Sequence, residues 1–157
     1  MDSSDALNRL AAYLTKKGLK STSQRRLITE VFFADEHEAS HPTVEELYLR
    51  VRAEDPRVGY ATVYRTLKLL VECGLAEPRR LGDNQTRYEP EEPGAHHDHL
   101  VCTECGAIVE FEEERIEALQ DQVVRRLGFA GLADHRMVLY GKPGSDCQVV
   151  GCRRGAR

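Results

Sequence analysis

Thirteen residues, GAHHDHLVCTECG at positions 94–106, contain three histidines, an aspartate and two cysteines that are separated by two residues. Imidazole, carboxylate and thiolate groups are the side chains that bind divalent metal ions in proteins. Thiolates favour Zn²⁺, whereas imidazole and carboxylate ligands also accept Fe²⁺ and Mn²⁺. Because both kinds of ligand are crowded into one stretch, the sequence predicts metal binding at more than one site.

Four of the five cysteines form two pairs, Cys102 with Cys105 and Cys147 with Cys152. Two such pairs, far apart in the sequence, can converge on one tetrahedral Zn²⁺. The first residues, MDSSDALNRL, contain acids and lack the apolar region of a signal peptide, so we expect a cytoplasmic protein whose thiols stay reduced. The alternative is that the second pair is incidental in a terminal tail. Cys73 has no partner spacing, and we expect it to pack in a core.

The histidines and the aspartate alternate along residues 96–101. If this segment is extended, His97 and His99 point to one face, while His96 and Asp98 point to the other. One short strand would then supply two half-sites with nitrogen and oxygen ligands. The candidates that could complete these half-sites are Glu89 and His41 on one face, and Glu117 and His135 on the other. For His41 and for His135 taken individually, the alternative is an ordinary histidine on the protein surface.

Composition and charge indicate a globular protein with two different halves. The 157 residues are 41% hydrophobic and 31% charged, which is typical of a soluble domain. No apolar run approaches the roughly 20 residues of a membrane span, so we expect no membrane partner. Residues 1–88 contain 14 basic and 13 acidic side chains, whereas residues 89–157 contain 8 and 13. This asymmetry favours two lobes with different partners.

Residues 1–88 have the pattern of four short helices followed by a β-hairpin. The third helix opens with a capping box formed by Thr43 and Glu46, and the fourth ends at Gly74. A turn at 82–84 divides the hairpin, with Arg79, Arg80 and Arg87 on its strands. Three helices and a hairpin form a winged helix-turn-helix, to which the first helix is an N-terminal addition. The apolar positions expected on the helix faces are Leu7, Leu10, Ala11, Leu14, Leu27, Ile28, Val31, Phe32, Leu47, Val51, Val63, Leu67, Leu70 and Val71.

The fourth helix, YATVYRTLKLLVECG, is the candidate recognition helix. Opposite its apolar stripe lie Arg65 and Lys68, with Thr62 and Tyr64 on the flanks. Hydrogen-bonding groups near the helix start suit base edges, and cations suit phosphates. Lys20 and Arg25 could add backbone contacts near the second helix. The alternative is an amphipathic helix whose charged face is only solvated.

Residues 89–95, EPEEPGA, are the expected hinge because two prolines and a glycine interrupt any regular structure. Beyond them, AIVEF and RMVLY have the pattern of strands on either side of a helix. This lobe has too little core to be stable alone, so we expect it to need metal or a second subunit. We therefore predict an α+β fold with a DNA-binding domain at 1–88, a hinge at 89–95 and a metal-binding dimerisation domain at 96–157.

The run HHDHLVCTECGAIVEF at 96–111, together with GYATVYRTLKLLVECGL at 59–75, resembles the ferric uptake regulator (Fur) family of bacterial metal-dependent repressors. The resemblance extends from GLKSTSQRR at 18–26 to LYG at 139–141. It implies an N-terminal winged helix that binds palindromic operator DNA and a C-terminal α/β domain that forms a homodimer. It also implies that Fe²⁺ bound between the two domains switches on repression of iron uptake genes.

The resemblance assigns particular residues to three metal sites and a DNA interface. The regulatory site falls on His41, Glu89, His97 and His99. A second site falls on His96, Asp98, Glu117 and His135, and a structural Zn²⁺ on Cys102, Cys105, Cys147 and Cys152. Lys20 resembles the minor-groove lysine of the family, and Tyr64 and Arg65 match its recognition-helix contacts.

The regulatory metal and the class of protein have alternatives. Glu89 and the run VEFEEERIEAL are most similar to the iron-responsive branch, in which Mn²⁺ or Zn²⁺ can replace Fe²⁺. Peroxide sensors of the family typically carry aspartate at the position of Glu89, and zinc-uptake regulators have a different ligand set near the hinge. Outside the family, the rival is a small zinc-dependent hydrolase. Because the chain has no nucleophile elbow or phosphate loop, we expect no enzyme and no small-molecule substrate other than metal ions.

Overall fold

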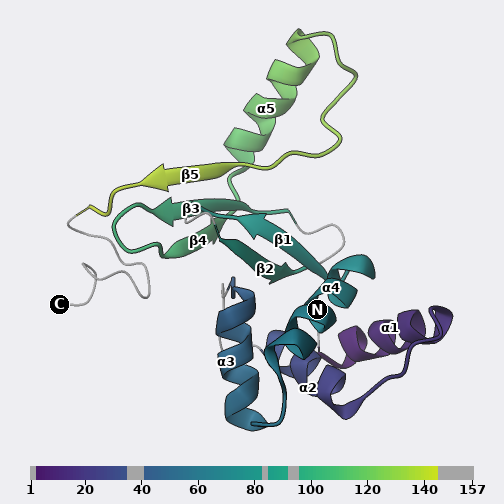
Figure 1. The fold of residues 1–157 in the computed structure, drawn as a ribbon. Helices are drawn as coiled ribbons and strands as arrows, with labels where there is room; N and C mark the ends of the chain where they lie inside the picture. The colour runs from purple at the N-terminus through teal and green to yellow at the C-terminus, as the bar shows by residue number, and fades with distance from the viewer. Residues whose placement is uncertain (1–2, 35–40, 83–84, 92–95, 145–157) are drawn as a thin grey trace. The chain divides into compact units, whose positions relative to one another are not determined.

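The computed structural model describes residues 3–34, 41–82, 85–91 and 96–144 of the chain (Figure 1). The chain divides into two compact units, residues 1–94 and residues 95–157. Within the described ranges, no helix has the length and apolar character needed to cross a membrane.

The first unit contains four helices followed by a two-stranded antiparallel sheet (Figure 1). This is the winged helix-turn-helix with an added first helix that the sequence predicts, and the α+β class is confirmed. The helices are α1 (Ser3–Lys16), α2 (Ser23–Phe32), α3 (Val44–Glu54) and α4 (Tyr60–Glu72), and the strands are β1 (Ala76–Arg80) and β2 (Thr86–Pro90).

One apolar core joins the helices of this unit, and it follows the predicted stripes with one correction. Ala11, expected on the inner face of α1, is exposed, and Ala6 is buried in its place. Ala6, Leu10 and Leu14 are spaced four residues apart, so they lie above one another on one face of the helix. A methyl group at position 11 adds little apolar area, and the larger leucines therefore set the face that packs inward.

Local signals fix where the helices begin and end. Thr43 caps α3: its side chain accepts a hydrogen bond from the Glu46 amide at 3.2 Å, and the Glu46 carboxylate accepts one from the Thr43 amide at 2.8 Å. Gly18 and Gly74, which follow α1 and α4, both have φ of +66°, a left-handed conformation that glycine adopts without strain. The predicted capping box and the predicted end of the fourth helix at Gly74 are confirmed.

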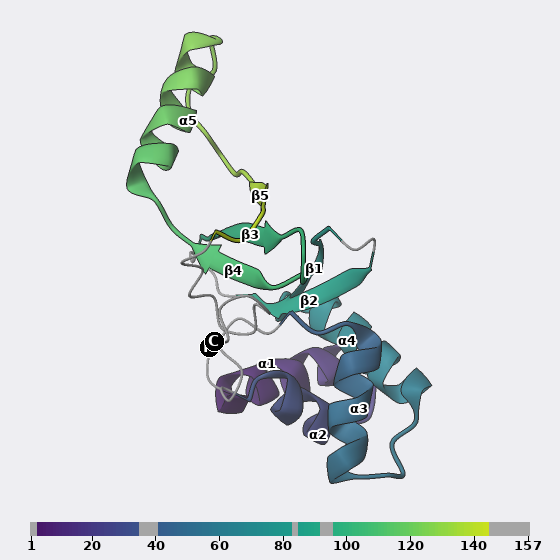
Figure 2. The same ribbon diagram turned by 90° about the vertical axis from the view of Figure 1, so that its left-hand side faces the viewer.

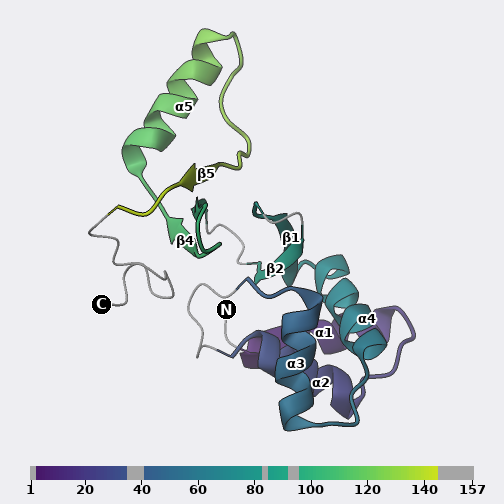
Figure 3. The same ribbon diagram turned by 60° about the vertical axis from the view of Figure 1, so that its left-hand side comes forward.

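The hairpin packs against the start of α3 (Figure 3). β1 and β2 are antiparallel, with Glu77 opposite Glu89 and Arg79 opposite Arg87. Thr43 forms an isolated bridge with Arg87, and the Tyr88 amide donates to the Pro42 carbonyl at 2.9 Å. These bonds hold the residues just before α3 beside the second strand of the hairpin.

The second unit contains a three-stranded sheet and one helix (Figure 2). β3 (Asp98–Cys102) is the central strand; β4 (Ile108–Phe111) pairs with it antiparallel and β5 (Val138–Gly141) pairs with it parallel. The extended segment expected at 96–101 therefore forms a strand at 98–102. The last strand, expected at 136–140, begins two residues later, because its ladder to β3 starts at Val138.

Helix α5 (Glu114–Arg126) has no buried residue, and it stands away from the sheet in all three views (Figures 1, 2 and 3). Among the described residues of this unit, Val101 is the only buried apolar side chain. The expectation that this lobe has too little core of its own agrees with the observed burial.

Candidate metal centres and nucleic-acid interface

Four potential metal ligands from three parts of the second unit meet in one cluster: His96, Asp98, Glu117 and His135. Their nearest ligand atoms all lie within 4.8 Å of one another. The Nε2 atom of His96 is 3.8 Å from an Asp98 oxygen and 3.4 Å from a Glu117 oxygen. The Nε2 atom of His135 lies at the same two distances from these carboxylates. The arrangement has two imidazoles and two carboxylates around a common centre.

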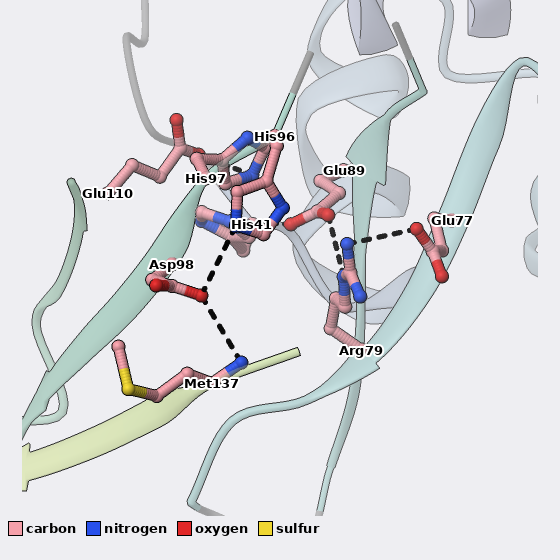
Figure 4. Close-up of polar contacts among 9 residues, drawn as sticks. All are labelled: His41, Glu77, Arg79, Glu89, His96, His97, Asp98, Glu110 and Met137. Atoms are coloured by element: carbon pink, nitrogen blue, oxygen red, sulfur yellow. Dashed lines mark hydrogen bonds and ion pairs between the residues drawn. The ribbon is translucent and has the colours of Figure 1, made fainter. Parts of the chain in front are cut away.

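Several buried polar atoms of this cluster have no hydrogen-bond partner among the described residues. Asp98 is 1% exposed, and its Oδ1 atom accepts a hydrogen bond from the Met137 amide at 3.2 Å (Figure 4). Its Oδ2 atom, Glu117 Oε1 and the Nε2 atoms of both histidines are buried without a hydrogen-bond partner. Buried polar atoms without partners are costly. A divalent cation that accepts these nitrogen and oxygen ligands would remove this cost, so the residues fit a metal ion.

In the first unit, His41 and Glu89 form a buried pair. His41 Nε2 lies 2.9 Å from Glu89 Oε2, and the two residues are 4% and 3% exposed. Arg87 on β2 donates to the His41 carbonyl at 2.9 Å and to Glu46 at 3.2 Å. Arg79 on β1 donates to Glu89 Oε1 at 2.6 Å (Figure 4). Arginines on the two strands of the hairpin therefore hold the two candidate ligands: Arg87 binds the backbone of His41, and Arg79 binds the carboxylate of Glu89.

In the second unit, His97 and His99 lie with ring centroids 5.0 Å apart, and His97 Nε2 is 3.9 Å from a Glu110 oxygen. Glu110 stands opposite His99 in the β3–β4 ladder. Potential ligand atoms of these three residues lie within 4.8 Å of one another. They form a second group of nitrogen and oxygen donors, separate from the cluster around Asp98.

Cys102 and Cys105 flank a tight turn at the end of β3. The Gly106 amide donates to the Cys102 carbonyl at 2.9 Å, and Gly106 has φ of +73°, which only glycine adopts readily. Cys102 and Cys105 are half-buried, and they are not joined to each other by a disulfide bond. Cys147 and Cys152 lie outside the described residues. Cys73 packs against the core at the end of α4, and burial raises the pKa of its thiol, as expected for a cysteine that serves packing.

The candidate DNA-contacting residues lie on or beside α2 and α4. Tyr64 and Arg65 are exposed on α4, and Thr62 is half-buried. The Lys68 ammonium lies 5.8 Å from the centre of the Tyr64 ring. Lys20 is exposed, and its carbonyl accepts a hydrogen bond from the half-buried Arg25 side chain. The outer face of α4 is therefore exposed to solvent. Its exposed side chains are Tyr60, Tyr64, Arg65 and Lys68.

Three residues near these sites were missed by reasoning from sequence. Tyr60, exposed at the first position of α4, lies four residues before Tyr64, so helical spacing could have placed both on one face. Glu110 could have been found from the register of a hairpin between the HHDH segment and AIVEF. Arg79 was placed on the wing, but nothing in the sequence ties it to Glu89.

The sequence profile of the ferric uptake regulator family matches residues 16–140. The chain belongs to this family. A ferric uptake regulation protein of Rhizobium leguminosarum bv. viciae is 41% identical over 141 residues, which cover 88% of this chain and 94% of the relative. The Fur chain is thus similar along nearly its whole length to a full-length relative.

Two solved structures extend the comparison from sequence to fold. The Fur chain is 30% identical to the ferric uptake regulator of Helicobacter pylori, with a TM-score of 0.81 over 94% of this chain and 95% of the other; that structure is described as revealing three functional metal binding sites. It is 41% identical to a zinc-bound manganese uptake regulator, with a TM-score of 0.68 over 86% of this chain and 98% of the other. The chain is therefore a member of a family of metal-responsive regulators.

Proposed function

We propose that this Fur chain is a cytoplasmic, Fe²⁺-dependent repressor that binds palindromic operator DNA as a homodimer and controls iron uptake genes. The observation that carries the proposal is the buried His41–Glu89 pair at 2.9 Å on the winged-helix unit. Eight and ten positions after Glu89, the chain presents His97 and His99 on the other unit. Ligands of one ion would thus be drawn from both sides of the connecting segment.

The regulatory ligands in this proposal are His41, Glu89, His97 and His99, with Glu110 beside the last two. A bound divalent ion would accept electron pairs from these imidazoles and carboxylates, and so would join side chains of the two units through one centre. His41 and Glu89 hold the DNA-binding unit to that junction, and His97 and His99 hold the metal-binding unit to it. The two recognition helices of a dimer are then held at the spacing of the operator half-sites.

The second site is proposed at His96, Asp98, Glu117 and His135, on the strength of their unpartnered buried atoms. A structural Zn²⁺ is proposed at Cys102 and Cys105 with Cys147 and Cys152. Gly141 pairs with Cys102 across the β3–β5 ladder, so the chain leaves β5 beside the cysteine turn. Cys147 follows Gly141 by six positions, and an extended chain of that length spans about 20 Å. The second cysteine pair is therefore within reach of the first.

The proposed homodimer rests on the apolar face of the second unit. Large apolar side chains are exposed on α5, on the segment that follows it and on the strands: Leu100, Leu119, Leu127, Phe129, Leu132, Leu139 and Tyr140. Exposed large apolar side chains in this number are typical of surfaces that form interfaces between proteins. A second copy of the chain presents the same surface, and a two-fold arrangement would bury both copies of it.

The proposed DNA contacts are Lys20, Arg25, Thr62, Tyr64 and Arg65. Exposed cations at the edge of the unit suit phosphates, and the hydroxyl and guanidinium groups at the start of α4 suit base edges in the major groove. This interface favours a regulator over the hydrolase alternative, since it has no use in an enzyme of that kind. We accordingly propose that the chain is not an enzyme.

The test is the DNA affinity of chelator-treated protein on a palindromic AT-rich duplex, titrated with Fe²⁺ under anaerobic conditions, with Mn²⁺ and with Zn²⁺. We expect Fe²⁺ to tighten binding by about 5- to 150-fold in the wild type, and by much less in His97→Ala. His135→Ala, which removes a histidine from the other cluster, is the matched control and should respond to metal. Absence of DNA binding with every metal would contradict the repressor.

Manganese response is the second candidate, because the 41% identical solved relative is a manganese uptake regulator. Imidazole and carboxylate ligands accept Mn²⁺ as well as Fe²⁺. If Mn²⁺ activates DNA binding at a lower free concentration than Fe²⁺ does, the chain is a manganese regulator that uses the same ligands.

A further inference from the structure

The Arg79 side chain lies between two carboxylates of the hairpin. Its Nε atom donates to Glu89 Oε1 at 2.6 Å, and its Nη2 atom lies 2.9 Å from Glu77 Oε2 (Figure 4). The guanidinium is only 17% exposed, so water screens these contacts weakly. Arg79 therefore makes two charge-assisted contacts, and one of them is to a proposed regulatory ligand.

The β1–β2 register explains why a cation is needed here. Glu77 and Glu89 are directly opposite each other in the ladder, and like charges at facing positions repel. Arg79 is the cation that lies between the two facing carboxylates.

This contact also divides the Glu89 carboxylate into two unlike oxygens. Oε1 is held by Arg79 at 2.6 Å, and Oε2 is 2.9 Å from His41 Nε2. Oε2 is thus the oxygen beside the imidazole ligand. A carboxylate oxygen that accepts a short charge-assisted hydrogen bond has one lone pair occupied and is the weaker metal ligand of the two, so this contact favours ligation through the other oxygen.

We propose that Arg79 is a positioning residue that sets the metal preference of the regulatory site, by keeping Glu89 Oε1 and so limiting Glu89 to ligation through Oε2. The proposal rests on the proposed regulatory ligand set. Zn²⁺ is satisfied by four ligands, whereas Mn²⁺ favours six and is bound largely through oxygen. Withholding one oxygen therefore disfavours Mn²⁺ more than Zn²⁺.

Comparing two ions of equal charge separates this role from two simpler ones. Loss of the Arg79 cation changes the electrostatic potential at the site equally for Mn²⁺ and Zn²⁺. Loss of structural support for the hairpin would likewise lower the affinities for both ions together. Only a change in the number of available oxygens shifts the ratio of the two dissociation constants.

The experiment measures Mn²⁺ and Zn²⁺ dissociation constants directly for wild type, Arg79→Gln and Arg80→Gln. All proteins carry Glu117→Ala, so that the second cluster does not contribute, and the zinc retained at the cysteines is counted. We expect Arg79→Gln to change the ratio in favour of Mn²⁺ by about tenfold, at the lower end of the range for residues that support a metal ligand. Arg80→Gln, an exposed charge on the same strand, should leave the ratio unchanged.

A spectrum gives an independent readout. Co²⁺ absorbs strongly in four-coordinate sites and weakly in six-coordinate ones, so Co²⁺-loaded Arg79→Gln should absorb less per bound ion than wild type. If the single variant does not fold, Arg79→Gln combined with Glu77→Gln removes the cation and one facing carboxylate together, and the same shift is expected. The proposal would be overturned if Arg79→Gln lowered the affinities for Mn²⁺ and Zn²⁺ by the same factor and left the Co²⁺ spectrum unchanged.

Glu89→Ala separates failure of this inference from failure of the proposed site. If Glu89→Ala leaves metal affinity unchanged, the proposed ligand set is wrong and the role of Arg79 is wrong with it. If Glu89→Ala weakens metal binding but Arg79→Gln does not move the ratio, only the role of Arg79 is wrong. In the Glu89→Ala background, Arg79→Gln should no longer change the ratio.

Discussion

Asp98 is 1% exposed and has a backbone amide at one oxygen, while its other oxygen has no hydrogen-bond partner among the described residues. A buried carboxylate in this situation is costly unless a cation lies beside it. The Nε2 atoms of His96 and His135 both lie 3.8 Å from Asp98 Oδ1. This distance is too long for a short ion pair, but it suits ligands around a shared ion. At the residue scale, the metal hypothesis for this cluster therefore depends on Asp98.

Asp98→Asn preserves the shape of the side chain but removes its charge. We expect metal affinity at the second cluster to fall by at least about tenfold, since even residues that only support a ligand have effects of 10- to 100-fold. Isothermal titration of chelator-treated protein measures it. Asp121→Asn, which removes an exposed carboxylate paired with Arg125 on α5, is the control. Equal affinities in both variants would exclude Asp98 as a ligand.

Thr43 is a second residue whose effect can be isolated, because it caps α3 two residues after His41. Thr43→Ala removes the bond to the Glu46 amide, and we expect the free energy of unfolding of the first unit to fall by about 1 kcal/mol. Urea denaturation followed by far-UV circular dichroism measures the change. Thr15→Ala, at an exposed position inside α1, should cost much less. A null effect of Thr43→Ala would mean that the hairpin alone fixes the start of α3.

Helix α5 is an amphipathic element whose apolar side chains are not buried by any other described part of the chain. Its apolar stripe consists of Ile116, Leu119, Val123 and the capping residue Leu127, and none of them is buried. Leu119 is 60% exposed and Leu127 is 68% exposed. An apolar stripe of this size is stable in water only when another surface covers it. At the scale of elements, α5 is therefore the part of the chain where the dimer hypothesis can be tested most directly.

Leu119→Glu places a charge in the middle of this stripe. We expect the protein to shift from dimer to monomer, because a carboxylate at the centre of an apolar interface has no partner. Sedimentation velocity over a range of protein concentrations measures the shift. Ala118→Glu adds the same charge on the opposite side of the helix and should remain dimeric. If both variants behave alike, α5 does not form the interface.

The whole molecule is expected to act as a switch in which metal binding and DNA binding are linked. Such coupling is reciprocal, so DNA must raise the affinity for the regulatory metal by the same factor by which the metal raises the affinity for DNA. A coupling of about 1–3 kcal/mol corresponds to a factor of about 5–150 in each direction.

Reciprocity can be measured in one preparation. Mn²⁺ affinity is determined with and without saturating operator duplex, and duplex affinity is determined with and without saturating Mn²⁺. We expect the two ratios to agree within about twofold, and we expect both to approach one in Glu89→Ala. Unequal ratios would indicate that a further equilibrium, such as dimer assembly, contributes to the response.

The sequence by itself determined the elements and the chemistry of this protein. Helical spacing, the Thr43 cap and the glycines at 18 and 74 are local signals, and the first unit follows them closely. Strand alternation sorted His97 and His99 from His96 and Asp98, because successive side chains on a strand point to opposite faces whatever the rest of the fold does. Ala11 was misplaced because apolar spacing alone does not reveal which of two adjacent faces has more area to bury.

Only the tertiary structure decided which distant residues meet. The pairing of Arg79 with Glu89 depends on the register of the hairpin, and the placing of Glu117 and His135 beside Asp98 depends on how α5 and β5 return to the sheet. These contacts join residues far apart in the chain, and no local spacing encodes them. The same reason explains the bare face of α5: the sequence shows an apolar stripe, but only the fold shows that nothing in the described part of the chain covers it.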